Sequence, residues 1–174
     1  TYLVVKGTKV SDVLVMAHKA MTTKLEAAWA QKSPLLALAN PEQLLILASI
    51  IEKESSRGSD RRTISQVFHN RLRSNMRLQT DPTVIYALGD EFDGDIRSRD
   101  LRVDSPFNTY RVKGLPPTPI ALPSFDSLLA AAQPTDGDYL YFVARGDGTS
   151  EFSLTLSEHN AAVRKFLMHG AKSN

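Results

Sequence analysis

Residues 41 to 56 read Pro-Glu-Gln-Leu-Leu-Ile-Leu-Ala-Ser-Ile-Ile-Glu-Lys-Glu-Ser-Ser, and this stretch organises the rest of the chain. Its middle part, residues 44–51, is apolar or alanine at every position but one, which predicts a helix covered by protein on most sides. Asn40 suits the cap position, Pro41 suits the first helical position, and Gln43 can reach back in a capping-box arrangement. We therefore expect a central, largely buried helix.

Three charged residues, Glu52, Lys53 and Glu54, continue this helix without a break. At about 100° per residue, Glu54 falls on the most apolar side of the helix, whereas Glu52 falls toward the side that contains Ser49. Because desolvation disfavours the charged form of a carboxyl, Glu54 is expected to keep its proton near neutral pH and to act as a general acid. The pattern alone leaves a second interpretation open, in which Glu54 is a boundary residue paired with an arginine.

The overall composition is that of one ordinary globular domain. The chain has 174 residues, of which 42% are hydrophobic, and a formal net charge of +2. This length suits one core, and the near balance of charge favours neither nucleic acid nor an anionic membrane as a partner. The absence of cysteine excludes disulfides and thiolate metal sites. No apolar run approaches the roughly 20 residues that span a bilayer.

Basic residues gather between Asp60 and Asp81, where no acid interrupts them. We interpret this segment as a solvated helix face, in preference to an anion-binding surface. His69 lies within it, without a second histidine or a carboxylate at ligand spacing, so no metal site is predicted. Nucleic-acid binding is not expected either.

Periodicity and turn residues predict the remaining elements. They are a short strand at 2–5, helices at 11–31, 60–74, 81–87, 124–133 and 157–169, and paired strands at 139–144 and 151–156. The expected caps are Ser11, Asp60, Asp81 and Ser157. The Pro-rich loop at 114–119 suits the wall of a binding cleft. Consecutive strands followed by a helix predict an α+β fold, in which helices surround the buried helix beside a small antiparallel hairpin.

Several kinds of chemistry find no support in the sequence. No Gly-rich phosphate loop follows a strand, no Gly-x-Ser-x-Gly elbow is present, and no cysteine can act as a nucleophile. A carboxylic acid beside polar cleft residues remains, which is typical of enzymes that cleave glycosidic bonds. A mechanism with two carboxylates would need a partner for Glu54, and the open candidates are Glu52, Asp81 and Asp104.

Motifs along the chain also resemble one known family. They are Ala-Ser-Ile-Ile-Glu-Lys-Glu-Ser at 48–55, Val-Phe-His-Asn-Arg-Leu at 67–72, Met-Arg-Leu-Gln-Thr-Asp-Pro-Thr-Val-Ile-Tyr at 76–86, Asn-Thr-Tyr at 108–110, Gly-Leu-Pro-Pro at 114–117, Tyr-Leu-Tyr-Phe-Val at 139–143 and Ser-x-His-Asn at 157–160. In this order and at this spacing, they resemble the endolytic murein transglycosylase family, also called MltG or YceG-like.

The resemblance implies a lytic transglycosylase that needs no cofactor. Such an enzyme cleaves the β-1,4 bond between N-acetylmuramic acid and N-acetylglucosamine inside peptidoglycan glycan strands and leaves a 1,6-anhydro-muramic acid end. The family's catalytic glutamate is the second acid of Glu-Lys-Glu-Ser, which is Glu54 here and agrees with the helical-face argument. A lysozyme-like cleft is expected around it. The alternative is a non-catalytic peptidoglycan-binding or scaffolding module.

By the same resemblance, five further residues are expected to bind substrate: Arg71, Gln79, Thr80, Asn108 and Tyr110. Gln79 suits an N-acetyl group, and Tyr110 either orients Glu54, supports the developing cation or anchors its loop. Arg71 is expected to pair either with a peptide-stem carboxylate or with Glu52. Asp81 is expected to cap its helix rather than act on substrate.

The resemblance also carries expectations about the longer protein. Family members usually have a membrane-spanning helix and a LysM-like region upstream, so residues 1–174 are expected to be a single catalytic domain trimmed at its N-terminus. We expect the full-length protein to be anchored in the inner membrane by a single pass, with this domain on the periplasmic side. Expected partners are glycan strands and wall synthases such as penicillin-binding proteins.

Overall fold

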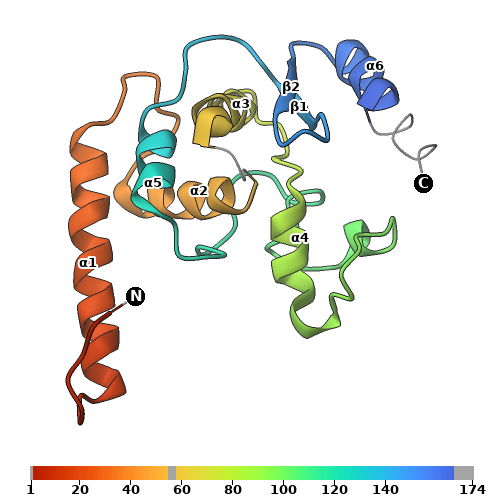
Figure 1. The fold of residues 1–174 in the computed structure, drawn as a ribbon. Helices are drawn as coiled ribbons and strands as arrows, with labels where there is room; N and C mark the ends of the chain where they lie inside the picture. The colour runs from red at the N-terminus through yellow and green to blue at the C-terminus, as the bar shows by residue number, and fades with distance from the viewer. Residues whose placement is uncertain (1, 55–57, 167–174) are drawn as a thin grey trace.

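The computed structural model describes residues 2–54 and 58–166, and Figure 1 shows their arrangement. The α-helices are α1 (Val10–Ala30), α2 (Pro41–Glu54), α3 (Arg61–Arg73), α4 (Asp81–Leu88), α5 (Phe125–Ala132) and α6 (Leu156–Phe166). Short 3-10 turns lie at Gly58–Asp60, Gly89–Glu91 and Asp100–Arg102. Strands β1 (Tyr141–Ala144) and β2 (Ser150–Ser153) form an antiparallel pair. The predicted class, helices with one small antiparallel hairpin, is confirmed.

Helix α2 is the centre of the core. Leu44, Leu47 and Ile50 on this helix are fully buried, and α2 packs against α1, α3, α4 and α5. Its start has the predicted cap, because Oδ1 of Asn40 accepts a hydrogen bond from the backbone N–H of Gln43 at 2.9 Å. The Gln43 side chain reaches back to the N–H before the cap, on residue 39, at 2.8 Å. Local sequence therefore defines the start of the helix that carries Glu54 at its other end.

Helix α1 joins the core along only half of its length. Residues of its second half, including Met21, Leu25 and Trp29, pack against the core, whereas Val10 is 77% exposed. The first half projects beyond the other helices, as Figure 1 shows. Among the described residues, no helix has both the length and the apolar character needed to cross a membrane.

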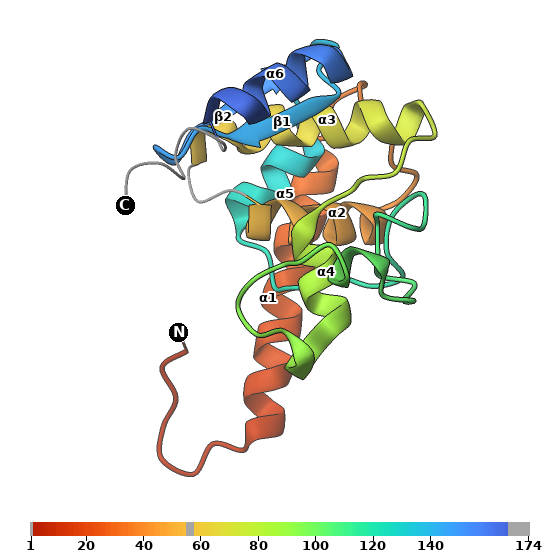
Figure 2. The same cartoon turned by 90° about the vertical axis from the view of Figure 1, so that its right-hand side faces the viewer.

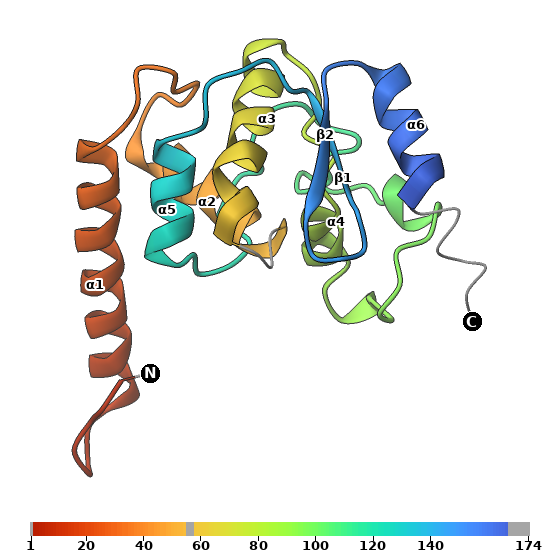
Figure 3. The same ribbon diagram turned by 45° about the horizontal axis from the view of Figure 1, so that its top comes forward.

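The hairpin and α6 form a separate layer on one side of α3. Figures 2 and 3 show β1 and β2 between α3 and α6, and both strands contact α6. Phe142 of β1 meets Phe68 of α3 edge to face, with ring centroids 5.9 Å apart. The hairpin is also tied to the start of α3, since Oδ2 of Asp60 accepts from the N–H of Ser150 at 2.8 Å. This layer completes the wall of the cleft described below.

Residues 2–5 do not form the predicted strand. They have no strand partner in the described part of the chain, and Leu3 is 95% exposed. A β-rich pattern without a partner has no ladder of hydrogen bonds to hold it.

Three of the predicted caps are also wrong. Helix α1 begins after Lys9, so Ser11 lies inside the helix, and α4 has Thr80 at its N-cap position in place of Asp81. At α6 the cap is Thr155, two residues before the predicted Ser157. The Thr155 hydroxyl accepts a hydrogen bond from the N–H of Glu158 at 3.2 Å, and the Glu158 carboxylate accepts one from the N–H of Thr155, which together form a capping box. Asp60 holds its predicted place, yet its carboxylate bonds the hairpin and caps nothing. The predicted end of the last helix, at residue 169, lies outside the described residues.

Candidate active site

A cleft of about 540 Å³ opens at the C-terminal end of α2. One wall comes from α2, α3 and the segments around residues 79–81 and 110, and the other comes from the hairpin and α6. The residues that line it are Glu54, Arg71, Gln79, Asp81, Tyr110, Tyr141, Phe142, Val143, Ala144, Ser150, Leu156, His159, Asn160 and Val163. Four of the predicted site residues therefore meet in one cavity: Glu54, Arg71, Gln79 and Tyr110.

Glu54 has the environment of a proton donor. Its side chain is largely enclosed by protein, and burial raises its pKa to about 7 from an ordinary value of 4.5. The hydroxyl of Thr80 donates a hydrogen bond to Oε1 and lowers this pKa, the charge of Asp81 raises it, and the charge of Arg71 lowers it. The balance leaves a carboxyl whose pKa lies near neutral pH, which suits a general acid.

The segment before α4 holds Thr80 against Glu54 through contacts with a distant loop. The N–H of Gln79 donates to the carbonyl of Thr109 at 3.2 Å, and the N–H of Thr80 donates to the Thr109 hydroxyl at 3.1 Å. Gln79 adopts a positive φ of 50°, an uncommon conformation for a residue other than glycine. The turn exposes the Gln79 side chain on the cleft wall and directs Thr80 inward. Such backbone strain is frequent at functional sites.

Thr80 was predicted to bind substrate, and the structure places it elsewhere. The residue is 1% exposed, and its hydroxyl contacts Glu54 below the cleft surface. It is therefore a positioning residue for the acid.

Arg71 is 7% exposed and uses its donors on backbone carbonyls. Nε donates to the carbonyl of Leu140 and Nη1 to that of Leu78, each at 2.7 Å, so the guanidinium joins α3 to the segments on both sides of the cleft. Its carbon Cζ lies 5.2 Å from the ring centroid of Tyr141, a cation–π distance. The prediction that Arg71 pairs with Glu52 is wrong, because the Glu52 carboxylate accepts its hydrogen bonds from Ser124 and Ser127 at the start of α5.

Tyr110 and Asp81 form a pair on the cleft wall. The Tyr110 hydroxyl donates to Oδ1 of Asp81 at 2.5 Å. Burial and this hydrogen bond raise the pKa of Tyr110, so its hydroxyl stays neutral. Tyr110 therefore hydrogen-bonds Asp81 and not Glu54, whereas the residue that hydrogen-bonds and orients Glu54 is Thr80. Asp81 is not the N-cap of α4, and its carboxylate lines the cleft while it accepts the hydrogen bond from Tyr110.

Asn108 was also predicted to bind substrate, and it does not line the cleft. It is fully buried, and its side-chain NH₂ donates to the carbonyls of Leu101 and Val103 at 3.1 and 2.8 Å. Its Oδ1 accepts from the N–H of Tyr110 at 3.0 Å. With its amide engaged on both sides, Asn108 shapes the loop that carries Tyr110.

The other two candidate carboxylates, of Glu52 and Asp104, do not line the cleft. Oε2 of Glu52 accepts from the N–H and hydroxyl of Ser124 at 2.9 and 2.6 Å and from the Ser127 hydroxyl at 2.6 Å. The side chain of Asp104 is 99% exposed and lies 3.8 Å from Arg111. Asp81 shares the cleft with Glu54, so any second carboxylate of the reaction would be Asp81.

His69 is held by the backbone at both of its ring nitrogens. Its Nδ1 accepts from the N–H of Ala37 at 3.0 Å, and its Nε2 lies 2.9 Å from the carbonyl of Ala131, to which it donates. Burial lowers its pKa to about 4, so the ring is neutral at pH 7. Across residues 2–54 and 58–166, no three His, Asp or Glu side chains gather as a metal site.

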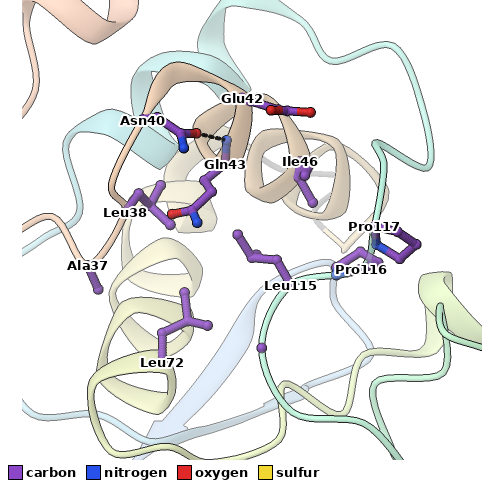
Figure 4. A pocket seen from close by; sticks show the side chains of 11 residues that line it. Ala37, Leu38, Asn40, Glu42, Gln43, Ile46, Leu72, Leu115, Pro116 and Pro117 are labelled. Atoms are coloured by element: carbon purple, nitrogen blue, oxygen red, sulfur yellow. Dashed lines mark hydrogen bonds between the residues drawn. The ribbon is translucent and has the colours of Figure 1, made fainter.

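A second cavity of about 480 Å³ lies at the opposite end of α2, and Figure 4 shows it. Asn40, Gln43 and Ile46 of the helix start face Leu115 and the prolines that follow it. The Pro-rich loop thus forms the wall of this cavity, and it does not line the cleft around Glu54. Of its residues, Glu42 alone is ionisable, and it is exposed, so nothing here resembles the environment of Glu54.

The hairpin and α6 supply cleft residues that sequence reasoning did not assign, above all Tyr141, His159 and Asn160. A signal for them was present, because the Tyr-Leu-Tyr-Phe-Val and Ser-x-His-Asn motifs contain all three. No periodicity argument could connect these motifs to a helix about a hundred residues earlier.

Fold and site together define a mixed helical domain whose cleft presents a carboxylic acid with a raised pKa. Comparison with known proteins agrees with the motifs: the model of the YceG-like family matches residues 1–165, and the chain belongs to this family. A crystal structure of a YceG-like protein from Listeria monocytogenes is 43% identical, with a TM-score of 0.65 over 86% of this chain and 44% of that chain.

Two curated relatives are named endolytic murein transglycosylase. The protein from Bacillus subtilis is 48% identical over 125 residues, which cover 72% of this chain and 34% of the relative. That from Streptococcus pneumoniae is 34% identical over 149 residues, which cover 83% of this chain and 26% of the relative. The chain thus spans about a third or less of these relatives.

Proposed function

We propose that this domain is a lytic transglycosylase that cuts glycan strands of peptidoglycan from within, with Glu54 as its single acid and base. One observation carries the proposal: a carboxyl with a pKa of about 7 lies in a cleft and is held there by a hydroxyl donor. The membership in the YceG-like family and the names of its relatives support the choice of substrate.

In the first half of the reaction, Glu54 is the proton donor. The hydrogen bond from Thr80 to Oε1 leaves Oε2 to carry the proton. Oε2 gives this proton to the glycosidic oxygen of the leaving N-acetylglucosamine while the bond from that oxygen to the anomeric carbon of N-acetylmuramic acid breaks. Positive charge develops at the anomeric carbon. The carboxylate of Asp81 stabilises this charge electrostatically from the cleft wall.

In the second half, the Glu54 carboxylate takes the proton of the C6 hydroxyl of the same muramic acid. The C6 oxygen attacks the anomeric carbon and closes the 1,6-anhydro ring, so no water is consumed and Glu54 regains its proton. The nucleophile belongs to the substrate and is already close to the reacting carbon. The nearby charge of Arg71 favours Glu54 as a carboxylate during this interval.

The other predicted site residues bind substrate or hold the residues that do. The exposed amide of Gln79 suits a hydrogen bond to an N-acetyl group on the wall beside Glu54. Tyr110 holds the Asp81 carboxylate, and Asn108 holds the loop of Tyr110. The periplasmic location and the wall synthases expected as partners stay predictions.

The test is the mass of the products released from purified, insoluble glycan strands by this domain. We expect fragments with anhydro ends, lighter by one water than the corresponding reducing ends, and no fragments from the matched variant Glu54→Gln. Reducing-end fragments would contradict the transglycosylase in favour of a hydrolase. Binding to strands without any fragments would favour a scaffolding module.

A further inference from the structure

Two histidines of this chain are enclosed by protein to different degrees, and the fold uses them differently. The ring of His69 is fully buried and both of its nitrogens are hydrogen-bonded, to Ala37 and Ala131. The ring of His159 is partly exposed and lines the cleft, and its Nδ1 is shielded from solvent without a hydrogen-bond partner among the described residues. A shielded polar atom without a partner destabilises the fold, because it has lost its hydrogen bonds to water. The fold gains nothing from the polarity of His159.

Packing explains the position of this ring but not its chemistry. His159 stacks on Tyr141, with ring centroids 5.4 Å apart and planes inclined by 26°. Tyr141 in turn lies against the buried guanidinium of Arg71. A phenyl ring at position 159 would make the same stack and would bury no unpaired nitrogen. The imidazole is therefore better explained by a contact inside the cleft.

The charge state of the ring indicates the kind of ligand. Burial and the charge of Arg71 lower the pKa of His159, so the imidazole is neutral at pH 7. With Nδ1 shielded, Nε2 is the nitrogen left to meet a ligand, and in a neutral imidazole it can either donate or accept, which suits an uncharged group that can do both. Sugar hydroxyls have this property. The next residue, Asn160, is exposed on the same wall, and its amide offers a donor and an acceptor for a hydroxyl or an N-acetyl group.

We propose that His159 and Asn160 form a saccharide-binding subsite that takes an uncharged N-acetylated hexose of the glycan strand. Tyr141 holds the imidazole by stacking, and Arg71 holds Tyr141. The strand thereby lies between the wall that carries Glu54 and Gln79 and the wall formed by α6. This inference rests on the proposed function, since it assumes a glycan in the cleft.

The experiment separates binding from cleavage. All variants carry Glu54→Gln, so the strand stays intact, and the probe is peptide-free glycan strands of alternating N-acetylglucosamine and N-acetylmuramic acid. Binding is measured by isothermal titration calorimetry. We expect His159→Phe, which keeps the stack and loses the nitrogens, to weaken binding about tenfold, and Asn160→Ala to weaken it several-fold. His18→Ala, an exposed histidine on α1, is the matched control and should bind like the Glu54→Gln parent.

The outcomes distinguish the two ideas. If His159→Phe and Asn160→Ala both bind within twofold of the parent, the subsite is wrong and the proposed function stands. If the Glu54→Gln parent itself fails to bind the strands, the proposed function is wrong. A second readout is the ¹⁵N chemical shift of the His159 ring in the parent, which should move when strands are added and would stay unchanged if the ring only packs.

Discussion

Glu52 and Glu54 lie two residues apart on α2, and hydroxyl groups donate to both carboxylates. Burial alone would raise the pKa of Glu52, but the hydrogen bonds from Ser124 and Ser127 and the charge of Arg61 outweigh it and hold this pKa below its ordinary value. Burial raises the pKa of Glu54 to about 7, because one hydroxyl opposes a stronger desolvation and Asp81 adds a like charge. The number of hydrogen-bond donors relative to the degree of burial therefore gives two otherwise identical side chains different pKa values.

The two carboxyls consequently have different tasks. Glu52 joins α2 to the start of α5, where Ser124 is the N-cap, so a negative charge meets the positive end of that helix. Glu54 lies at the open cleft and keeps its proton near neutral pH. One is an anion that holds helices together, and the other is an acid that can react.

The largest expected effect is on cleavage. Glu54→Gln keeps the shape of the side chain and removes the transferable proton, so the rate of strand cleavage should fall about 10²- to 10⁴-fold. Glu52→Gln should cleave within about tenfold of the parent, since Glu52 does not line the cleft. The measurement is the initial rate of fragment release under equal conditions.

An exchange of these two results, with Glu52→Gln inactive and Glu54→Gln active, would reverse the comparison. Both variants need a circular dichroism spectrum that matches the parent.

The next effect concerns pH. Because the proton donor must be protonated and its pKa is about 7, the rate of cleavage should fall about tenfold per unit as pH rises well above 7. Initial rates between pH 5 and 9 would test this, with folding checked at each pH. A rate that stays constant up to pH 9 would show that Glu54 does not donate the limiting proton.

Stability should respond to the two substitutions with opposite dependence on pH. The lowered pKa of Glu52 stabilises the fold above its unfolded value of about 4.5, and this stabilisation is lost as pH falls through the lower folded value. Glu52→Gln should therefore lower the free energy of unfolding at pH 7 by up to about 1 kcal/mol, since solvent screens this partly exposed carboxylate, and by less in acid.

For Glu54 the sign is reversed. Its raised pKa costs stability as pH rises from about 4.5 through about 7, so Glu54→Gln should gain stability relative to the parent above pH 7. Urea denaturation of both variants at pH 5 and pH 8 measures the difference. If the change in the free energy of unfolding between pH 5 and pH 8 were the same for both variants, the contrast between the two carboxyls would be wrong.

The smallest expected effect is a shift of the pH profile through the neighbours of Glu54. Asp81→Asn removes a like charge and should move the midpoint to lower pH, whereas Thr80→Val removes a donor to the carboxylate and should move it to higher pH, each by up to about one unit. Tyr110→Phe, which spares both charges, serves as the control. If the midpoint moved in the same direction for both variants, the two substitutions would be acting through a general change in the packing around Glu54, and not through the charge of Asp81 and the hydrogen bond of Thr80.

Local patterns predicted much of this structure correctly. The apolar run and the Asn40 cap placed α2, and the helical period put Glu54 on its enclosed side. The hairpin at 141–153 was anticipated because a glycine-rich turn separates two alternating segments. The errors at residues 2–5, Asn108 and Thr80 share a cause: each depends on partners that are distant in sequence.

By itself, then, the sequence determined which segments are helical, where α2 begins, and which acid of Glu-Lys-Glu-Ser faces the apolar side, because backbone periodicity and caps act over a few residues. Tertiary structure alone decided which donors and charges meet each acid. Ser124 reaches Glu52 across 72 positions, Thr80 reaches Glu54 across 26, and Tyr110 reaches Asp81 across 29. A pKa depends on desolvation and on donors within a few ångströms, and only the folded chain brings these together.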